Sequence, residues 1–326
     1  ASRMRAGLAT VISGIPLREY EPLIRAFEEV DTYAMCVGES AIETFAGSAF
    51  VSAITSKSRI ISGVATWSRP PVTTALAATT VDELSGGRYE LGIGTMPVHW
   101  MRDHYGIDPE RPLARMREYV EVIRKAWKAH SGNTCEFSGE FYRITGYRRI
   151  APPLRDEIPI YLAATRPGMA KLTGEIAEGA LVNWLHTREW IDEVMEPAIA
   201  AGEKISGNKC QRAAMVRVLV EPDPVRAREI LRPSFALYQQ TPYFPEVAAY
   251  SGWDSKALPD ALVDAMTVHG SVDEVVATIR SRYGHWADWL EISPPSAIPG
   301  ADLHRAYMDL LPVLRALNLP EGGQGL

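Results

Sequence analysis

The chain has 326 residues, of which 46% are hydrophobic and 23% are charged, ordinary values for a folded protein that exclude a disordered chain, a fibre and a disulfide-stabilised miniprotein. The net charge of −6 disfavours nucleic acid as a partner, because a polyanion would be repelled. No apolar run reaches the ~20 residues of a membrane span, and no long apolar core follows the first five residues, so neither a membrane helix nor a signal peptide is expected.

Segments typical of strands and of helices alternate along the chain. Pro71 stands in the first turn of one predicted helix, where a missing N–H costs nothing, and Ser85, Gly86 and Gly87 end that helix. The predicted strands are 6–12, 32–37, 59–64, 89–93, 158–163, 180–183, 213–220 and 286–292. The predicted helices are 20–29, 42–55, 71–84, 112–128, 167–178, 188–201, 223–235, 271–283 and 303–314.

Two segments interrupt this alternation. Residues 133–145 indicate a β-hairpin inserted at the surface. Residues 239–256 are rich in Tyr, Pro, Trp and Gly and indicate an ordered excursion. Both are expected to shape or shield a binding pocket.

About eight βα units predict parallel strands with right-handed crossovers. Over this length they favour an α/β fold of the TIM (β/α)8 barrel type over an open doubly wound sheet. We expect a single domain over residues 1–326, with insertions near 133–145 and 239–256. Active sites of such barrels lie at the C-terminal ends of the strands, so functional residues are expected just after each strand.

Several familiar motifs are incomplete. Gly92 and Gly94 begin a dinucleotide-type pattern, but Pro97 replaces its third glycine, and the residues that follow are not expected to open a helix. Glycines at the end of a barrel strand, where a ligand approaches the backbone closely, are a better explanation of these two residues. His99 and His104 lie five positions apart without a carboxylate cluster, so no metal site is predicted. Neither a serine-hydrolase elbow nor a P-loop is present.

The cysteines are odd in number and far apart in the chain. This pattern indicates free thiols in a reducing cytoplasm and neither a disulfide framework nor a zinc site. They are Cys36, Cys135 and Cys210.

The segment 163–169 follows a strand and opens a helix. The first N–H groups of a helix have no intrahelical partner and attract anions, and Arg166 adds positive charge. An ordinary βα loop is the alternative explanation for these residues. For residues 63–71, which follow another predicted strand, the alternative to a functional role is a proline-rich turn. Glu39 and Trp100 each follow a strand, but taken singly they are better explained by solvation or packing than by a functional role. The same holds for His186 and His269.

Taken together, six segments resemble the luciferase-like flavin and deazaflavin oxidoreductase superfamily. The sequence is most similar to the branch of coenzyme F420-dependent oxidoreductases related to methylenetetrahydromethanopterin reductase. The segments appear in the family's order and span roughly residues 6–295. They are SGVATWSRPP (62–71), LSGGRYELGIGT (84–95), RMREY (115–119), GEFY (139–142), PIYLAA (159–164) and GEIAEG (174–179).

The resemblance implies a TIM-like barrel, a homodimer and a cofactor site. It implies a cis peptide at Gly63–Val64, forming a bulge that backs the central ring of the flavin or deazaflavin. Thr66 corresponds to a ring-contacting hydroxyl, and Glu39 to an acidic residue near the ring. The loop flanking the cofactor would contain Thr95, Met96 and Trp100. The loop holding its phosphate would contain Ala164, Thr165, Arg166, Pro167 and Gly168.

Two departures from the family pattern bear on the chemistry. Sugar-phosphate dehydrogenases of this superfamily carry a His directly after the acidic residue, where this chain has Ser40, and a Glu two residues after Gly-Thr, where it has Pro97. Glucose-6-phosphate oxidation is therefore disfavoured. His99 is the nearest replacement proton donor by position, although the nearest family pattern has a His at the position of Trp100.

The leading hypothesis is hydride transfer between coenzyme F420 and a small organic substrate, with Glu39, His99 or water as the proton donor. Trp67, Trp100 and Trp184 suggest a flat or hydrophobic substrate. Two alternatives stay open: a monooxygenase that uses FMN and oxygen, and a non-catalytic flavin-binding barrel.

Overall fold

The strands of this protein join into one parallel sheet that closes on itself. The computed structural model describes residues 4–10, 15–39, 42–295 and 300–319, and the sheet order there is β10-β9-β11-β1-β2-β3-β4-β7-β8, with a further pairing of β9 to β8 that closes the barrel. The strands are β1 (Arg5–Ala9), β2 (Ala34–Val37), β3 (Arg59–Ser62), β4 (Tyr89–Ile93), β7 (Ile160–Ala164), β8 (Gly179–Val182), β9 (Gln211–Val220), β10 (Thr267–Gly270) and β11 (Trp289–Ser293).

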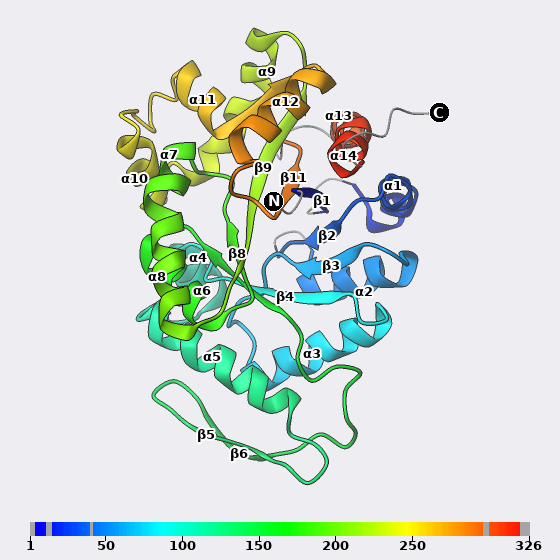
Figure 1. The fold of residues 1–326 in the computed structure, drawn as a ribbon, viewed down its shortest axis with the longest axis vertical. Helices are drawn as coiled ribbons and strands as arrows, with labels where there is room; N and C mark the ends of the chain where they lie inside the picture. Colours follow the sequence, from blue (N-terminus) through cyan, green and yellow to red (C-terminus); the bar gives the residue numbers. More distant parts are fainter. Residues whose placement is uncertain (1–3, 11–14, 40–41, 296–299, 320–326) are drawn as a thin grey trace.

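Helices surround this barrel, as Figure 1 shows. They bury one face against the strands, as α1 does with Tyr20, Leu23, Ile24 and Phe27. The helices are α1 (Leu17–Glu29), α2 (Thr44–Ile54), α3 (Pro71–Leu84), α4 (Val98–Tyr105), α5 (Pro112–Trp127), α6 (Pro167–Ile176), α7 (Arg188–Trp190), α8 (Glu196–Ser206), α9 (Pro224–Leu231), α10 (Tyr243–Tyr250), α11 (Asp260–Met266), α12 (Val272–Tyr283), α13 (Gly300–Met308) and α14 (Leu311–Asn318). A π-helical turn, Ile191–Met195, precedes α8, and a 3-10 helix, Arg232–Tyr238, follows α9.

The strands are buried on both faces, which is why their sequences are apolar runs without strict alternation. One set of side chains fills the barrel interior, and the other faces the helices. The interior set comprises Ala34, Cys36, Ile61, Tyr161, Leu181, Ala213 and Trp289.

The predicted barrel is confirmed, with some differences in detail. Contrary to the prediction, a helix does open after Gly94: α4 starts directly after Pro97 and ends at Gly106, whose φ of 64° suits glycine. The predicted helix 303–314 is two helices, because Pro312 starts a new first turn. Strand β10 and helix α11 have no counterpart among the predicted elements. The end of the first predicted strand, residues 11–12, and the loop residue Ser13 lie outside the described residues.

The predicted hairpin is confirmed as β5 (Cys135–Ser138) and β6 (Arg143–Tyr147). It lies beside α5 at the lower edge of Figure 1. The Glu118 carboxylate of α5 accepts hydrogen bonds from the backbone N–H groups of Glu140 and Phe141 at 2.7 and 2.8 Å. This contact holds the hairpin turn against the helix.

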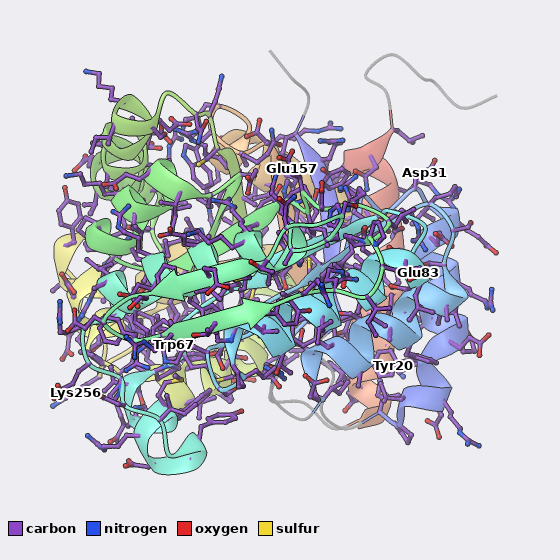
Figure 2. The ribbon with its side chains drawn as sticks, turned by 90° about the horizontal axis from the view of Figure 1, so that it is seen from below. Tyr20, Asp31, Trp67, Glu83, Glu157 and Lys256 are labelled. Carbon is purple, nitrogen blue, oxygen red and sulfur yellow. The ribbon has the colours of Figure 1, made fainter. Side chains whose placement is uncertain are left out.

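The two ends of the barrel carry different segments. Asp31 and Glu83 lie on one side of the molecule in Figure 2, whereas Trp67, which follows β3, and Lys256, in the excursion, lie on the other. The excursion therefore belongs to the end of the barrel where Trp67 lies. Within the described parts of the chain, no helix is both long and apolar enough to cross a membrane.

Candidate active site

A cavity of about 1190 Å³ opens at the C-terminal ends of the barrel strands. Residues that follow β2, β3, β4, β7 and β8 contribute to its wall, together with residues of β9 and the segment after β11. Ten of the twelve distinct cofactor-site residues expected from the sequence line it: Glu39, Gly63, Val64, Thr95, Met96, Trp100, Thr165, Arg166, Pro167 and Gly168.

The Gly63–Val64 peptide bond is cis, as the resemblance implies. Gly92 of β4 and Gly94, which directly follows that strand, allow this bulge to pack closely against the next strand. A Cβ atom on Gly92 would lie 1.9 Å from the Ser62 carbonyl oxygen, and one on Gly94 would lie 2.6 Å from Val64 Cγ2. These glycines are therefore needed for strand-to-bulge packing, and the bulge is exposed to the cavity above it.

Glu39 lies at the end of β2 and pairs with Arg69 at 2.9 Å. Arg69 also contacts Glu43, which accepts a hydrogen bond from the Ala46 N–H at the start of α2. Burial raises the pKa of Glu39 above its ordinary value, and the Arg69 guanidinium acts in the opposite direction. Glu39 is thus a carboxyl group that can hold a proton beside the cavity.

The loop after β7 leads into α6 within the cavity wall. The helix starts at Pro167, and the N-cap residue Arg166 provides no side-chain hydrogen bond to the first turn. The early N–H groups of α6 are consequently available to an anion. Arg166 itself pairs with Glu246 of α10 at 2.9 Å, so its charge is partly compensated.

Three residues predicted from the sequence do not line the cavity. Thr66 is fully buried and donates a hydrogen bond to Ser68 Oγ at 3.0 Å. Ala164 is buried at the end of β7. His99 lies on α4 with its ring 5.9 Å from that of Trp100 in an edge-on arrangement. The structure thus brings Glu39 to the cavity but not His99. Ser40 lies outside the described residues.

Sequence reasoning missed several residues of the wall. The largest omission is Arg217 on β9, whose one signal in the sequence is a cation within the apolar run 213–220. Others come from the 3-10 helix and the segment after it, among them Ser234, Tyr238 and Tyr243.

The two inserted segments differ in their relation to this cavity. Pro242, Tyr243 and Glu246, from the excursion, line it. No residue of the hairpin does, so the expectation that both segments shape the pocket is met by the excursion alone. Of the tryptophans, Trp100 and Trp184 line the cavity, whereas Trp67 is buried outside its wall.

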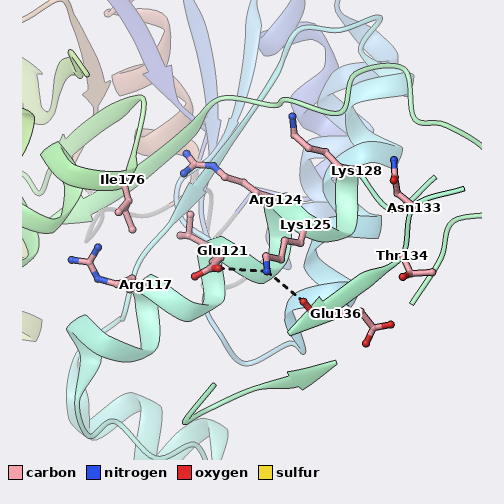
Figure 3. Close-up of a pocket in the computed structure, with 10 residues that line it drawn as sticks. Arg117, Glu121, Arg124, Lys125, Lys128, Asn133, Thr134, Glu136 and Ile176 are labelled. Carbon is pink, nitrogen blue, oxygen red and sulfur yellow. Dashed lines mark hydrogen bonds and ion pairs between the residues drawn. The ribbon is translucent and has the colours of Figure 1, made fainter. Parts of the chain in front are cut away.

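A second hollow, of about 720 Å³, lies between α5 and the hairpin strand β5 (Figure 3). Its cations already have partners. Arg117 pairs with Glu175, Arg124 with Glu178 at 2.9 Å, and Lys128 with Glu157 at 2.6 Å. Lys125 contacts the side chain of Glu121 and the carbonyl of Glu136. Among its described lining residues, this groove offers no unpaired cation, and none of them lies at the C-terminal end of a barrel strand.

Comparisons with known proteins agree with this geometry. The model of the family described as luciferase-like monooxygenase matches residues 4–288. A Mycobacterium tuberculosis protein named as a putative coenzyme F420-dependent oxidoreductase is 30% identical over 248 residues, which are 64% of this chain and 70% of that protein. The 5,10-methylenetetrahydromethanopterin reductase of Archaeoglobus fulgidus is 30% identical over 235 residues, 64% of this chain and 68% of the reductase.

Among solved structures, the fold is similar to that of an F420-dependent secondary alcohol dehydrogenase in complex with an F420-acetone adduct. The TM-score is 0.81 at 16% sequence identity, and the match covers 97% of this chain and 99% of the other.

Proposed function

We propose, since this chain belongs to the luciferase-like monooxygenase family, that it is an oxidoreductase that transfers a hydride between coenzyme F420 and a small organic substrate. The observation that carries the proposal is one continuous cavity that contains both the Gly63–Val64 bulge and the N-terminus of α6. A tricyclic ring needs a flat apolar support, and its phosphate needs free N–H donors. The names of the relatives from Mycobacterium tuberculosis and Archaeoglobus fulgidus support the same class.

The wall of the cavity fits a large polar ligand. Its volume, about 1190 Å³, exceeds that of ordinary small-molecule sites. Three buried hydrogen-bond donors in the wall have no hydrogen-bond partner among the described residues: Trp184 Nε1, Arg217 Nε and Ser234 Oγ. Buried polar atoms in folded proteins are almost always paired, so these atoms favour a ligand that carries acceptors.

Coenzyme F420, when bound, supplies a deazaflavin ring that carries a hydride and does not readily take part in one-electron oxygen chemistry. Gly63 and Val64 would support one face of the ring. Gly168 and Met169 of α6 would donate N–H groups to the phosphate, and Thr95, Met96 and Trp100 would flank the cofactor. These contacts would orient the reacting groups and exclude water from them.

Glu39 is the proton donor that the geometry favours, because it lies at the cavity while His99 does not. Its carboxyl group would release a proton to the substrate when a C=C or C=N bond is reduced. Arg69, paired with Glu39, would stabilise the carboxylate that remains.

The second candidate is a flavin-dependent monooxygenase that uses FMN and oxygen, which the description of the family model supports. The two cofactors share the ring system and differ in the tail beyond the phosphate. Equilibrium binding of F420 and of FMN to the purified protein distinguishes them. We expect tighter binding of F420, and FMN binding at least tenfold tighter would reverse the assignment.

A charge variant tests the phosphate end of the same site. Gly168→Glu places a carboxylate beside the first N–H groups of α6 and should weaken cofactor binding at least tenfold through repulsion. Lys171→Glu, on an exposed position of the same helix, is the matched control and should change binding less than threefold. Equal effects of the two variants would mean that this helix end does not hold the phosphate.

Turnover of reduced F420 with a panel of enones, imines and nitroaromatics then separates an enzyme from a non-catalytic flavin-binding barrel. Tight cofactor binding with no turnover would favour the binding protein. The homodimer implied by the resemblance is part of the proposal, and sedimentation of the purified protein would test it.

A further inference from the structure

Arg217 holds an unusual position among the charged residues of the cavity. It extends from the buried strand β9, is only 6% exposed, and lines the cavity. Its Nη1 atom donates hydrogen bonds to Ser293 Oγ at 2.7 Å and to the Pro294 carbonyl at 2.8 Å. The guanidinium lies 4.7 Å from the ring centre of Trp184. These contacts fix the orientation of the side chain.

The positive charge of Arg217 has no counterion in the described parts of the chain. No carboxylate there lies within 4.0 Å of its guanidinium, whereas the other charged residues of the wall are paired: Arg166 with Glu246, and Glu39 with Arg69. Burying a cation without an anion is costly. Burial accordingly lowers the pKa of Arg217, although an arginine keeps its proton under ordinary conditions.

One edge of the guanidinium is free for a ligand. Nε is buried without a hydrogen-bond partner, and no described residue accepts a hydrogen bond from Nη2. Nε and Nη2 point in parallel, which matches the two oxygens of a carboxylate in a bidentate pair. Trp184 Nε1 and Ser234 Oγ are further buried polar atoms of the same wall without partners.

We propose that Arg217 binds a carboxylate of the substrate, so that the protein acts on organic acids. This inference rests on the proposed function, in which the remaining cavity holds the cofactor. The residues around Arg217 are apolar or aromatic, namely Met215, Trp184 and Tyr238, so the acid that fits has a flat apolar body.

The main rival explanation is an internal partner. Glu291 on the neighbouring strand β11 is fully buried, and no residue that the structure describes donates a hydrogen bond to either of its carboxyl oxygens. It does not line the cavity. Burial raises the pKa of Glu291 to about 8, and the charge of Arg217 acts in the opposite direction. No hydrogen bond joins these two described side chains, so Glu291 leaves Nε of Arg217 without a partner.

The test is calorimetric titration of the F420-loaded protein with cinnamate and, as the neutral probe of the same shape, cinnamamide. We expect the wild type to bind cinnamate at least tenfold more tightly than cinnamamide. Arg217→Met should lose that preference and leave F420 affinity within threefold of the wild type. Arg217→Lys, which keeps the charge without the paired donors, should retain part of it. Glu291→Gln, the matched control, should bind cinnamate within threefold of the wild type.

Three results would overturn the proposal. The first is equal affinity of the wild type for the two probes, which needs no variant and decides the matter even if Arg217→Met fails to fold. The second is a tenfold loss of F420 affinity in Arg217→Met, which would assign the arginine to the cofactor. The third is a tenfold gain in cinnamate affinity in Glu291→Gln, which would show that Glu291 already pairs with Arg217. Absence of F420 binding to the wild type would instead contradict the proposed function, and titration of the cofactor-free protein with the two probes would still test Arg217.

Discussion

Glu39, Arg69 and Glu43 form a small charged group beside the cavity, and each member influences the others. Arg69 lies between the two carboxylates and contacts both. Its positive charge lowers the pKa of Glu39, while the negative charge of Glu43 and the burial of Glu39 raise it. The pKa of Glu39 is therefore set by Arg69, about 30 positions away in the chain, and by Glu43, about 4 positions away. Only Glu43 belongs to the same loop.

If Glu39 donates the proton, activity requires its protonated form and falls as the pH rises through its pKa. Arg69→Met removes the cation, so the pKa of Glu39 rises further and the falling limb of kcat/KM moves to higher pH. Glu39→Gln should lower kcat by about 10²–10⁴-fold and abolish that limb. Steady-state rates measured as a function of pH, with enones as acceptors, would check this.

Glu43→Gln is the control for that experiment, because it should move the same limb in the opposite direction. Removing the negative charge of Glu43 lowers the pKa of Glu39, while the amide oxygen can still accept from the Ala46 N–H. Identical pH profiles in wild type, Arg69→Met and Glu43→Gln would exclude Glu39 as the titrating donor.

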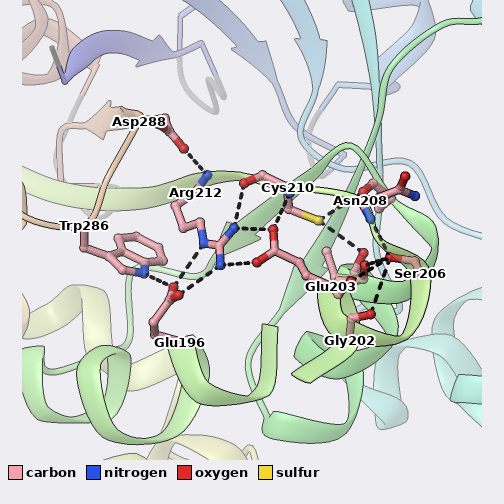
Figure 4. A network of polar contacts seen from close by, with 12 residues as sticks. Glu196, Gly202, Glu203, Ser206, Asn208, Cys210, Arg212, Trp286 and Asp288 are labelled. Atoms are coloured by element: carbon pink, nitrogen blue, oxygen red, sulfur yellow. Dashed lines mark hydrogen bonds and ion pairs between the residues drawn. The ribbon is translucent and has the colours of Figure 1, made fainter. Parts of the chain in front are cut away.

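At the level of helices and strands, a buried ion-pair network joins α8 to the strands at the end of the barrel away from the cavity (Figure 4). Arg212, at the start of β9, donates to Glu196 at 3.0 Å and to Glu203 at 2.7 Å. Its backbone N–H donates to Asp288 at 2.7 Å, just before β11, and Trp286 donates to Glu196 at 2.7 Å. Because every charge has a partner, this network can tolerate burial.

Arg212→Met should lower the free energy of unfolding by about 3 kcal/mol, because it leaves two partly buried carboxylates, Glu196 and Glu203, without a cation. The Arg212 guanidinium, opposing the effect of burial, holds the pKa of Glu203 below 4.5. A lowered carboxyl pKa contributes stability above the unfolded-state pKa and loses it as the pH falls through the folded-state pKa. The difference in the free energy of unfolding between wild type and variant should therefore be largest at pH 7 and smaller near pH 3. Urea unfolding at the two pH values would measure it.

Arg124→Met provides the matched comparison, since it breaks the more exposed pair with Glu178. Exposed pairs contribute less than about 1 kcal/mol, so this variant should unfold close to the wild type. A loss as large as that of Arg212→Met would contradict the assignment of stability to the buried network.

In the whole molecule, the excursion and the hairpin lie on different parts of the barrel. The excursion contributes Tyr243 and Glu246 to the cavity, whereas the hairpin packs on α5 through Glu118. The cavity and the network around Arg212 likewise lie at opposite ends of the strands. Binding and stability can therefore be altered separately in this fold.

Replacing residues 136–146 by a short glycine-containing turn tests this separation. Cys135 and Tyr147 are paired across the hairpin, so a short link can join them. We expect F420 affinity within twofold of the wild type, together with some loss of stability from the exposed face of α5, as measured by cofactor titration and thermal unfolding. A tenfold loss of cofactor affinity would show that the hairpin reaches the site.

The alternation of strands and helices, and with it the barrel, was determined by the sequence alone, because apolar runs, helix starts and glycine or proline positions are local properties of the chain. Because active sites of such barrels lie at the C-terminal ends of the strands, functional residues were expected just after each strand. Glu39, Gly63 and Thr165 follow strands and line the cavity. Helix α4 was not predicted because it has only eight residues, no capping side chain and a single buried side chain, that of Met101.

Only the tertiary structure decided which side chains share the cavity. Ala164 does not line it although Ala163 and Thr165 do, Thr66 does not although Val64 does, and Arg217 reaches it from an apolar part of β9. The partners of Arg217 lie 76 and 77 positions further along the chain. They meet because β9 and β11 are neighbours in the closed sheet, and such pairings depend on how the barrel closes, which no local sequence pattern encodes.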